Sequence, residues 1–123
     1  MPINLRDFAR SERVPCFFEA EVVSSEKRLR AECLNLSLSG AFFVFKEGIH
    51  LGTLVDVYLP LNEGKPLLAH GTVARRGRCV KYLASSRVDN LAVAMDGMGV
   101  EFDPLTLDDI ARLSDFLDHL LDR

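Results

Sequence analysis

The sequence has no tryptophan, no pair of cysteines at C-x-x-C spacing and no long hydrophobic run. A membrane-spanning helix needs about 20 apolar residues, so no membrane insertion is expected. The first seven residues also lack the apolar core of a signal peptide, which favours a cytoplasmic location. The three cysteines, Cys16, Cys33 and Cys79, are odd in number and widely spaced. This pattern favours reduced, mostly buried thiols over a metal site.

Signatures of catalysis are also missing. The sequence contains no P-loop, no H-E-x-x-H motif and no dinucleotide-binding glycine fingerprint. Ser39-Gly40 lacks the preceding glycine of a nucleophile elbow. The histidines have no carboxylate or second histidine at ligand spacing and are expected at the surface or partly buried; they are His50, His70 and His119. We therefore expect no enzyme activity, no metal and no cofactor.

The charge balance disfavours a nucleic acid polymer as a partner. The chain carries 15 Lys and Arg against 18 Asp and Glu, a net charge of −3, and offers no tryptophan for stacking on bases. An anion site would therefore have to be a local basic cluster. The length of 123 residues and the hydrophobic content of 48% suit one globular domain with a core of ordinary size.

The hydrophobic pattern predicts a mainly β protein. Strands are expected over residues 16–23, 29–34, 41–45, 54–59, 67–75, 91–95 and 98–102. Asp96-Gly97 is typical of a hairpin turn and would join the last two of these strands. Residues 77–90 are ambiguous, because 79–83 suits a strand and 85–86 a loop.

The spacing of apolar residues changes near the C-terminus and predicts a helix over residues 107–122. Thr106 to Asp109 resembles a capping box, with Asp in place of Glu or Gln. The residues that follow place an apolar stripe at helical spacing: Ile110, Leu113, Leu117 and Leu120, widened by Phe116 and Leu121. Many short strands followed by one helix indicate an antiparallel sheet or small barrel with a helix packed against it.

Two motifs suggest a site for an anionic ligand: the arginines Arg6, Arg10 and Arg13, and the run from Asn35 through Ser37 to Gly40. An arginine fork meets both a phosphate and the O6/N7 edge of guanine with two parallel hydrogen bonds. Asn35 could accept a hydrogen bond from a ligand, Ser37 could donate one, and Gly40 could let backbone approach the ligand. Each also has a purely structural interpretation. The arginines could belong to a solvated terminus and Asn35 to an Asx-turn. Ser37 could be an exposed strand serine and Gly40 a turn or bulge glycine.

The two motifs resemble the signature of PilZ domains, R-x-x-x-R followed by [DN]-x-S-x-x-G. Asn35, Ser37 and Gly40 match the second motif in full. Arg6 and Arg10 have the literal spacing of the first motif, but Arg13 stands where the family usually places its second arginine. Arg13 and Arg10 are therefore expected as primary ligands, with Arg6 as a third. Two further stretches are similar to the family's last two strands: Gly97–Phe102 and Gly71–Val73.

The resemblance implies a small antiparallel β-barrel of about six strands with a C-terminal α-helix over residues 14–123, preceded by a flexible arm over residues 1–13. It implies a receptor for the bacterial second messenger cyclic di-GMP, in which ligand binding orders the arm and signals to an unidentified partner protein. The alternative is a PilZ-like interaction module that binds no nucleotide. A second basic cluster either faces the ligand or forms a solvated rim: Arg75, Arg76 and Arg78.

Overall fold

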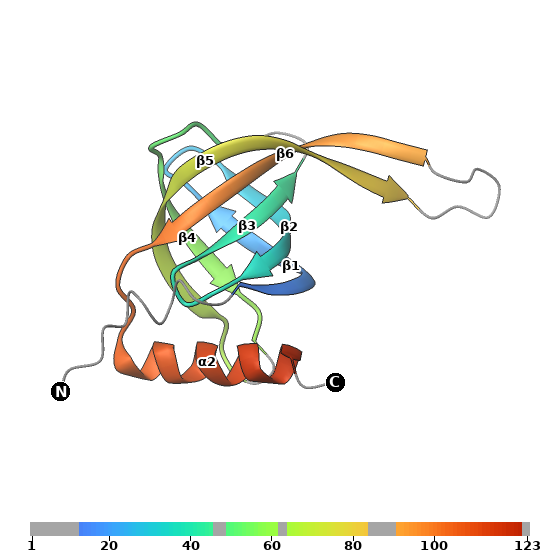
Figure 1. Cartoon of the computed structure of the whole chain (residues 1–123). Helices are drawn as coiled ribbons and strands as arrows, with labels where there is room; N and C mark the ends of the chain where they lie inside the picture. Colours follow the sequence, from blue (N-terminus) through green and yellow to red (C-terminus); the bar gives the residue numbers. More distant parts are fainter. Residues whose placement is uncertain (1–12, 46–48, 62–63, 84–90, 122–123) are drawn as a thin grey trace.

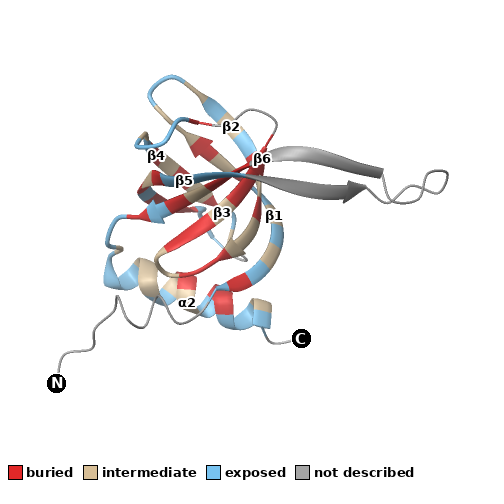
Figure 2. Cartoon of the chain, turned by 45° about the horizontal axis from the view of Figure 1, so that its top comes forward, coloured by how far each residue is buried: buried red, intermediate tan, exposed pale blue. Residues whose placement is uncertain are grey.

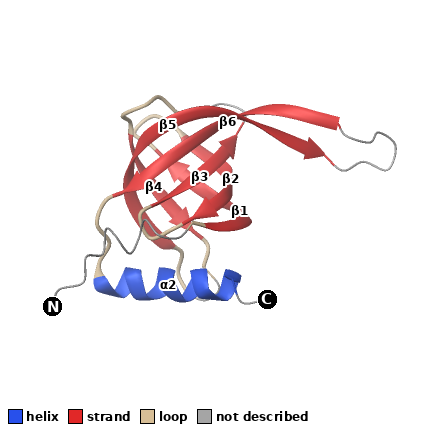
Figure 3. Cartoon of the chain, in the orientation of Figure 1, coloured by secondary structure: helices blue, strands red, loops and turns tan. Residues whose placement is uncertain are grey.

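The computed structural model describes residues 13–45, 49–61, 64–83 and 91–121, with the backbone alone described over 78–83 and 91–96. The described chain forms six strands and one helix (Figure 3). The elements in chain order are β1 (Val14–Val23), β2 (Arg28–Leu36), β3 (Gly40–Phe45), β4 (Leu54–Leu59), β5 (Leu67–Leu83), β6 (Leu91–Phe102) and α2 (Leu107–Leu121).

The six strands close into an antiparallel barrel in the order β1-β2-β3-β6-β5-β4 (Figure 1). The closing contact pairs β1 with β4 from Glu21↔Tyr58 to Val23↔Asp56. Closure gives each strand of the barrel two neighbours, which limits the exposed edges that promote edge-to-edge aggregation. The predicted fold class, a mainly β antiparallel barrel with a C-terminal helix, is confirmed.

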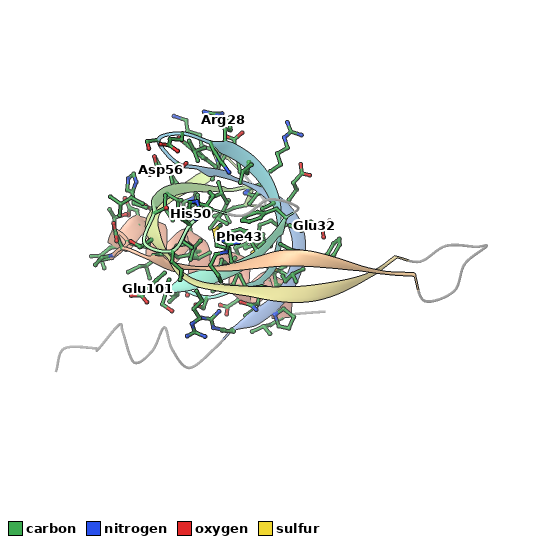
Figure 4. The ribbon with its side chains drawn as sticks, turned by 90° about the horizontal axis from the view of Figure 1, so that it is seen from above. Arg28, Glu32, Phe43, His50, Asp56 and Glu101 are labelled. Atoms are coloured by element: carbon green, nitrogen blue, oxygen red, sulfur yellow. The ribbon has the colours of Figure 1, made fainter. Side chains whose placement is uncertain are left out.

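The buried residues lie mainly along the strands of the barrel (Figure 2), and the core also includes Ile49 and the helix residues Leu113, Phe116 and Leu117. β3 contributes most densely, since every residue of this strand except Phe42 is buried. Phe43 is fully buried and lies in the middle of the barrel (Figure 4). The burial of β3 agrees with the nearly continuous apolar run over residues 41–45, which is typical of a strand covered on both faces.

Helix α2 lies across one end of the barrel (Figure 1). Thr106 caps it, because its Oγ1 accepts a hydrogen bond from the Asp109 N–H at 3.1 Å. The buried face is narrower than the predicted stripe and consists of Leu113, Phe116 and Leu117. The expectation that Leu121 widens this stripe is wrong, because its side chain is 50% exposed. A T-shaped contact between Phe116 and Phe18 of β1, with ring centroids 5.7 Å apart, joins helix and barrel.

The predicted hairpin turn at Asp96-Gly97 is wrong. β6 continues through both residues, which pair with Arg78 and Gly77 of β5 and with Phe45 and Val44 of β3. A side chain at position 97 would collide with the ring of Phe42, so this glycine serves close packing rather than a turn. β5 is correspondingly longer than predicted, and its pairing with β6 continues beyond the barrel as a two-stranded ribbon (Figure 1). Residues 79–83, which the sequence left ambiguous, belong to β5, whereas residues 84–90 lie outside the described residues.

Candidate functional site

The structure brings together one residue from each of the two sequence motifs. The guanidinium of Arg13 donates from Nη1 to the side-chain oxygen Oδ1 of Asn35 at 3.0 Å, and both groups are accessible to solvent. Arg13 immediately precedes β1, and Asn35 lies near the end of β2, where it pairs with Pro15. The two residues are 22 positions apart in sequence, so the contact depends on the antiparallel pairing of β1 with β2.

Two irregularities in strand pairing surround Asn35. The register of β1 against β2 shifts between Pro15 and Phe18, and the register of β2 against β3 shifts between Cys33 and Asn35. Such bulges add a residue to one strand, bend it and redirect its side chains. The end of β2 is therefore twisted away from a regular ladder at the place where Asn35 presents its amide.

Ser37 and Gly40 form the tight connection between β2 and β3. Ser37 is only 1% exposed, and its N–H and hydroxyl both donate to the carbonyl of Gly40, at 2.9 and 3.3 Å. The same hydroxyl accepts from the N–H of Ser39 at 3.2 Å and lies 3.1 Å from the Ser39 hydroxyl. Ser37 thus organises the turn, and its side chain is turned away from solvent.

Gly40 is buried where β3 passes β6, with Glu101 as its pairing partner. A Cβ atom at this position would collide with the backbone oxygen of Val100. Its φ is not positive, since Gly52 and Gly64 are the positive-φ glycines of the described chain. The glycine is therefore required here by the close approach of two backbones.

A row of outward-facing residues leads from Asn35 across the barrel to β5. Cα pairing joins Asn35 to Phe42 on β3, Phe42 to Gly99 on β6, and Gly99 to Arg75 on β5. A Cβ placed on Gly99 would lie 3.4 Å from the Cβ of Arg75 and 3.9 Å from its Cδ, so the arginine side chain lies over this glycine. The row spans three strand spacings, or about 14 Å.

The arginines of the second basic cluster, Arg75, Arg76 and Arg78, do not share one environment. Arg75 belongs to the row described above, whereas Arg76 donates from Nη1 to the backbone carbonyl of Ile49 at 3.4 Å. The side chain of Arg78 lies outside the described ones. Sequence reasoning could not separate these arginines, because a register shift between Val73 and Arg75 determines which of them faces the row.

Arg6, Arg10 and the rest of the predicted arm over residues 1–12 lie outside the described residues. The described chain begins at Arg13, and β1 begins one residue later. The arm therefore remains a prediction. Arg13, its last residue, is described by the structure and contacts Asn35.

Two further pairs of side chains are contacts that the sequence did not reveal. His70 on β5 pairs directly with Asp56 on β4, and its Nδ1 lies 2.6 Å from the carboxylate Oδ1 on the solvent-exposed surface. The thiols of Cys16 and Cys33 are free, and their sulfur atoms lie 3.5 Å apart. Both contacts join neighbouring strands, so close spacing in sequence could not have indicated them.

Within the described part of the chain, no group of three or more His, Cys, Asp or Glu side chains is placed to hold a metal ion. None of the described helices is long and apolar enough to cross a membrane.

The geometry offers hydrogen-bonding groups of two kinds on one outer face. Guanidinium groups stand at both ends of the row, at Arg13 and Arg75, and the amide of Asn35 lies beside the first. Guanidinium groups bind phosphate or the Hoogsteen edge of guanine and can stack on a base, whereas an amide oxygen accepts from the Watson–Crick edge. Together, fold and site define a small closed β-barrel with two guanidinium groups and an amide on its outer face.

The family model for the PilZ domain matches residues 4–119, and the chain therefore belongs to the PilZ domain family. Members of this family are ligand-binding and effector modules. No curated protein sequence matches the chain.

Solved structures support the fold. The chain is similar to the PilZ domain with c-di-GMP of YcgR from Escherichia coli, with a TM-score of 0.66, 11% identity, and coverage of 89% of this chain and 88% of that one. It is also similar to the PilZ domain of CeSA from a cellulose-synthesizing bacterium, with a TM-score of 0.61, 16% identity, and coverage of 90% and 99%. The inhibitor of motility MotI/DgrA from Bacillus subtilis gives a TM-score of 0.58 at 18% identity, and this chain spans half its length.

Proposed function

We propose that this protein is a cytoplasmic receptor for cyclic di-GMP, and that the ligand lies on the outer face between Arg13 and Arg75. The observation that carries the proposal is the hydrogen bond between Arg13 and Asn35, which joins the two motifs of the family signature at one point of the barrel. The PilZ domain of YcgR, a similar structure, is described with c-di-GMP.

The ligand has two guanine bases and two phosphates, and the row supplies groups for both. In the proposal, Arg13 and Arg10 bind a guanine edge or a phosphate through their forks, and Arg6 adds a third cation. Asn35 accepts from the N1–H and N2–H₂ edge of guanine. Arg75 reaches the other end of the ligand from across Gly99, where its plane can stack on a base.

Ser37 and Gly40 complete the proposed site as the residues that shape its rim. The hydrogen bonds of Ser37 hold the turn after Asn35, and Gly40 lets β3 approach β6 closely. A fixed turn keeps Asn35 in place before the ligand arrives, which lowers the ordering cost of binding.

The arm is proposed to act as the switch. Residues 1–12 carry charges of both signs, and a segment this short cannot by itself bury enough surface to offset its ordering entropy. A ligand held by Asn35 and Arg13 would recruit Arg10 and Arg6 and create a surface made of arm, ligand and barrel rim. An unidentified partner protein would then detect the ligand by binding that surface.

Calorimetric titration of the purified protein tests the proposal. We expect binding of cyclic di-GMP in preference to GTP and cyclic di-AMP, because adenine places an N6 donor where the arginine fork needs the O6 acceptor of guanine. Arg13→Ala should weaken binding by about tenfold or more, the effect of losing one bidentate contact. Its melting temperature should stay nearly unchanged, because the Arg13–Asn35 bond is exposed to solvent.

Arg28→Ala is the matched control. Arg28 lies on the same strand as Asn35 and pairs with Glu21 at 3.0 Å, but it sits on the opposite side of the barrel from Glu101, the pairing partner of Gly40 (Figure 4). This variant should bind like the wild type. No heat with cyclic di-GMP at millimolar ligand would refute the receptor and favour the interaction module that binds no nucleotide.

A further inference from the structure

Two thiols lie beside the proposed ligand site. Cys16 on β1 and Cys33 on β2 have sulfur atoms 3.5 Å apart, close enough for a hydrogen bond between the thiols. Cys33 is two residues from Asn35, and Cys16 is three residues from Arg13. The pair therefore joins the same two strands as the Arg13–Asn35 contact, at the adjacent position of the sheet.

The local backbone gives this pair freedom to move. Cys16 lies within the bulge of β1, where the register shifts between Pro15 and Phe18. The sulfur atoms of a disulfide are about 2.05 Å apart, so closing the present separation requires a shift of about 1.5 Å. A bulged strand can make such a shift with less disruption than a regular ladder, because the bulged residue is not held by ladder hydrogen bonds.

The two thiols differ in reactivity. Cys16 is half-buried, whereas Cys33 is completely buried in the core. The side-chain hydrogen bond with Cys33 lowers the pKa of the Cys16 thiol, although burial works in the opposite direction. The same hydrogen bond, reinforced by burial, raises the pKa of Cys33. An oxidant would therefore meet the more accessible and more acidic sulfur first, with the second thiol next to it.

We propose that Cys16 and Cys33 form a thiol oxidation site for hydroperoxides whose disulfide form weakens ligand binding. The Cys16 thiolate attacks one peroxide oxygen, the O–O bond breaks, and hydroxide leaves and is protonated to water, leaving a sulfenic acid on Cys16. The sulfur of Cys33 then attacks the Cys16 sulfur, the S–O bond breaks, and the thiol proton and the hydroxyl leave as water. Two thiols and one hydrogen peroxide thus give one disulfide and two waters.

The coupling to the ligand site follows from the single proton of Cys33. In the reduced protein this thiol donates to the backbone carbonyl of Asn35 at 3.3 Å. Disulfide formation removes that donor and draws the β1 bulge toward β2. The Arg13–Asn35 bond, at 3.0 Å, tolerates only a few tenths of an ångström of displacement. This consequence rests on the proposed binding of cyclic di-GMP, whereas the thiol chemistry does not.

The chemistry is tested first without ligand, in a Cys79→Ser background that leaves only the two thiols. After stoichiometric hydrogen peroxide, intact mass should fall by two hydrogen atoms, both cysteines should resist alkylation in denaturant, and dithiothreitol should restore them. Cys33→Ala should stop at a sulfenic acid on Cys16 that dimedone traps. Cys16→Ala should leave Cys33 unreacted. Oxidation of Cys33 in that variant, or a disulfide only between chains, would overturn the proposal.

Binding is then measured on the reduced and oxidised forms of the same protein. We expect the Kd for cyclic di-GMP to rise by about threefold or more on oxidation and to recover after reduction. Equal affinity in the two forms overturns the coupling. If the reduced protein binds no cyclic di-GMP, the receptor function fails, while mass and alkylation still decide the thiol chemistry.

Discussion

Replacing Gly40 with alanine distinguishes a glycine needed by the fold from one needed only by a ligand. The added Cβ would lie closer than 3.0 Å to the backbone oxygen of Val100, a separation that real Cβ atoms essentially never show. It would also lie 3.4 Å from the Cα of Glu101. Because these neighbours are backbone atoms of β6, they cannot rotate away as a flexible side chain could.

The cost can be bounded from the structure. Optimal separations between non-bonded carbon atoms are about 3.5–4.0 Å, so β3 and β6 would have to separate by on the order of 1 Å near this point. That movement strains the Gly40↔Glu101 pairing and the hydrogen bond from the Phe102 N–H to the Ser39 carbonyl, which is 2.8 Å long. Overpacking typically costs about 1–3 kcal/mol, and a contact between two backbones belongs at the upper end of this range. A destabilisation of about 3 kcal/mol would lower Tm by about 10 °C.

Thermal unfolding in the absence of ligand measures this effect, with Gly77→Ala as the control. No atom lies within 4 Å of a Cβ built on Gly77, and its φ is not positive. The control should therefore melt at or slightly above the wild-type temperature, since alanine reduces the entropy of the unfolded chain. If the two variants melt within a degree or so of each other, the packing argument for Gly40 is wrong.

Three further predictions follow from the turn, the helix and the thiols. Ser37→Ala should lower the free energy of unfolding by about 2 kcal/mol in urea, because it leaves the buried turn and the carbonyl of Gly40 without the hydroxyl. Thr106→Ala should lower it by about 1 kcal/mol by removing the helix cap. The side-chain hydrogen bond with Cys33 lowers the pKa of Cys16, so its thiolate should form at a lower pH than an ordinary thiolate. Iodoacetamide should therefore alkylate Cys16 at pH values where free cysteine still reacts slowly.

The sequence predicted the ends of a strand or helix well where a nearby residue in the chain determines that end. β4 has the predicted bounds, Leu54–Leu59, since alternating burial is ended by Pro60. α2 begins where the cap residue Thr106 indicated. The hairpin prediction failed because Asp96-Gly97 has the composition of a turn, while the packing of Phe42 against Gly97 keeps the chain extended. A contact between strands that are distant in sequence overrode a strong local preference.

The sequence indicated which motif residues to consider for the candidate site, but not how their side chains are placed. The motif residues were identified by spacing, but the burial of Ser37 and its bonds within the turn could not be read from that spacing. The position of Arg75 in the same row as Asn35 depends on pairing across β2, β3, β6 and β5, which are neighbours around the barrel but do not all follow one another in the sequence. Bulges within these pairings also shift which side chains share a face.

Two glycines of β6 lie under larger side chains on the outer face where the ligand is proposed to bind. β6 lies between β3 and β5, and its inward-facing neighbour Met98 is fully buried. On the outer face, Gly97 lies beneath the ring of Phe42 and Gly99 beneath the stem of Arg75. A larger residue at either position would displace these side chains and separate the two ends of the row. The two glycines that accommodate the Phe42 ring and the Arg75 stem are therefore also those that keep the surface from Asn35 to Arg75 continuous.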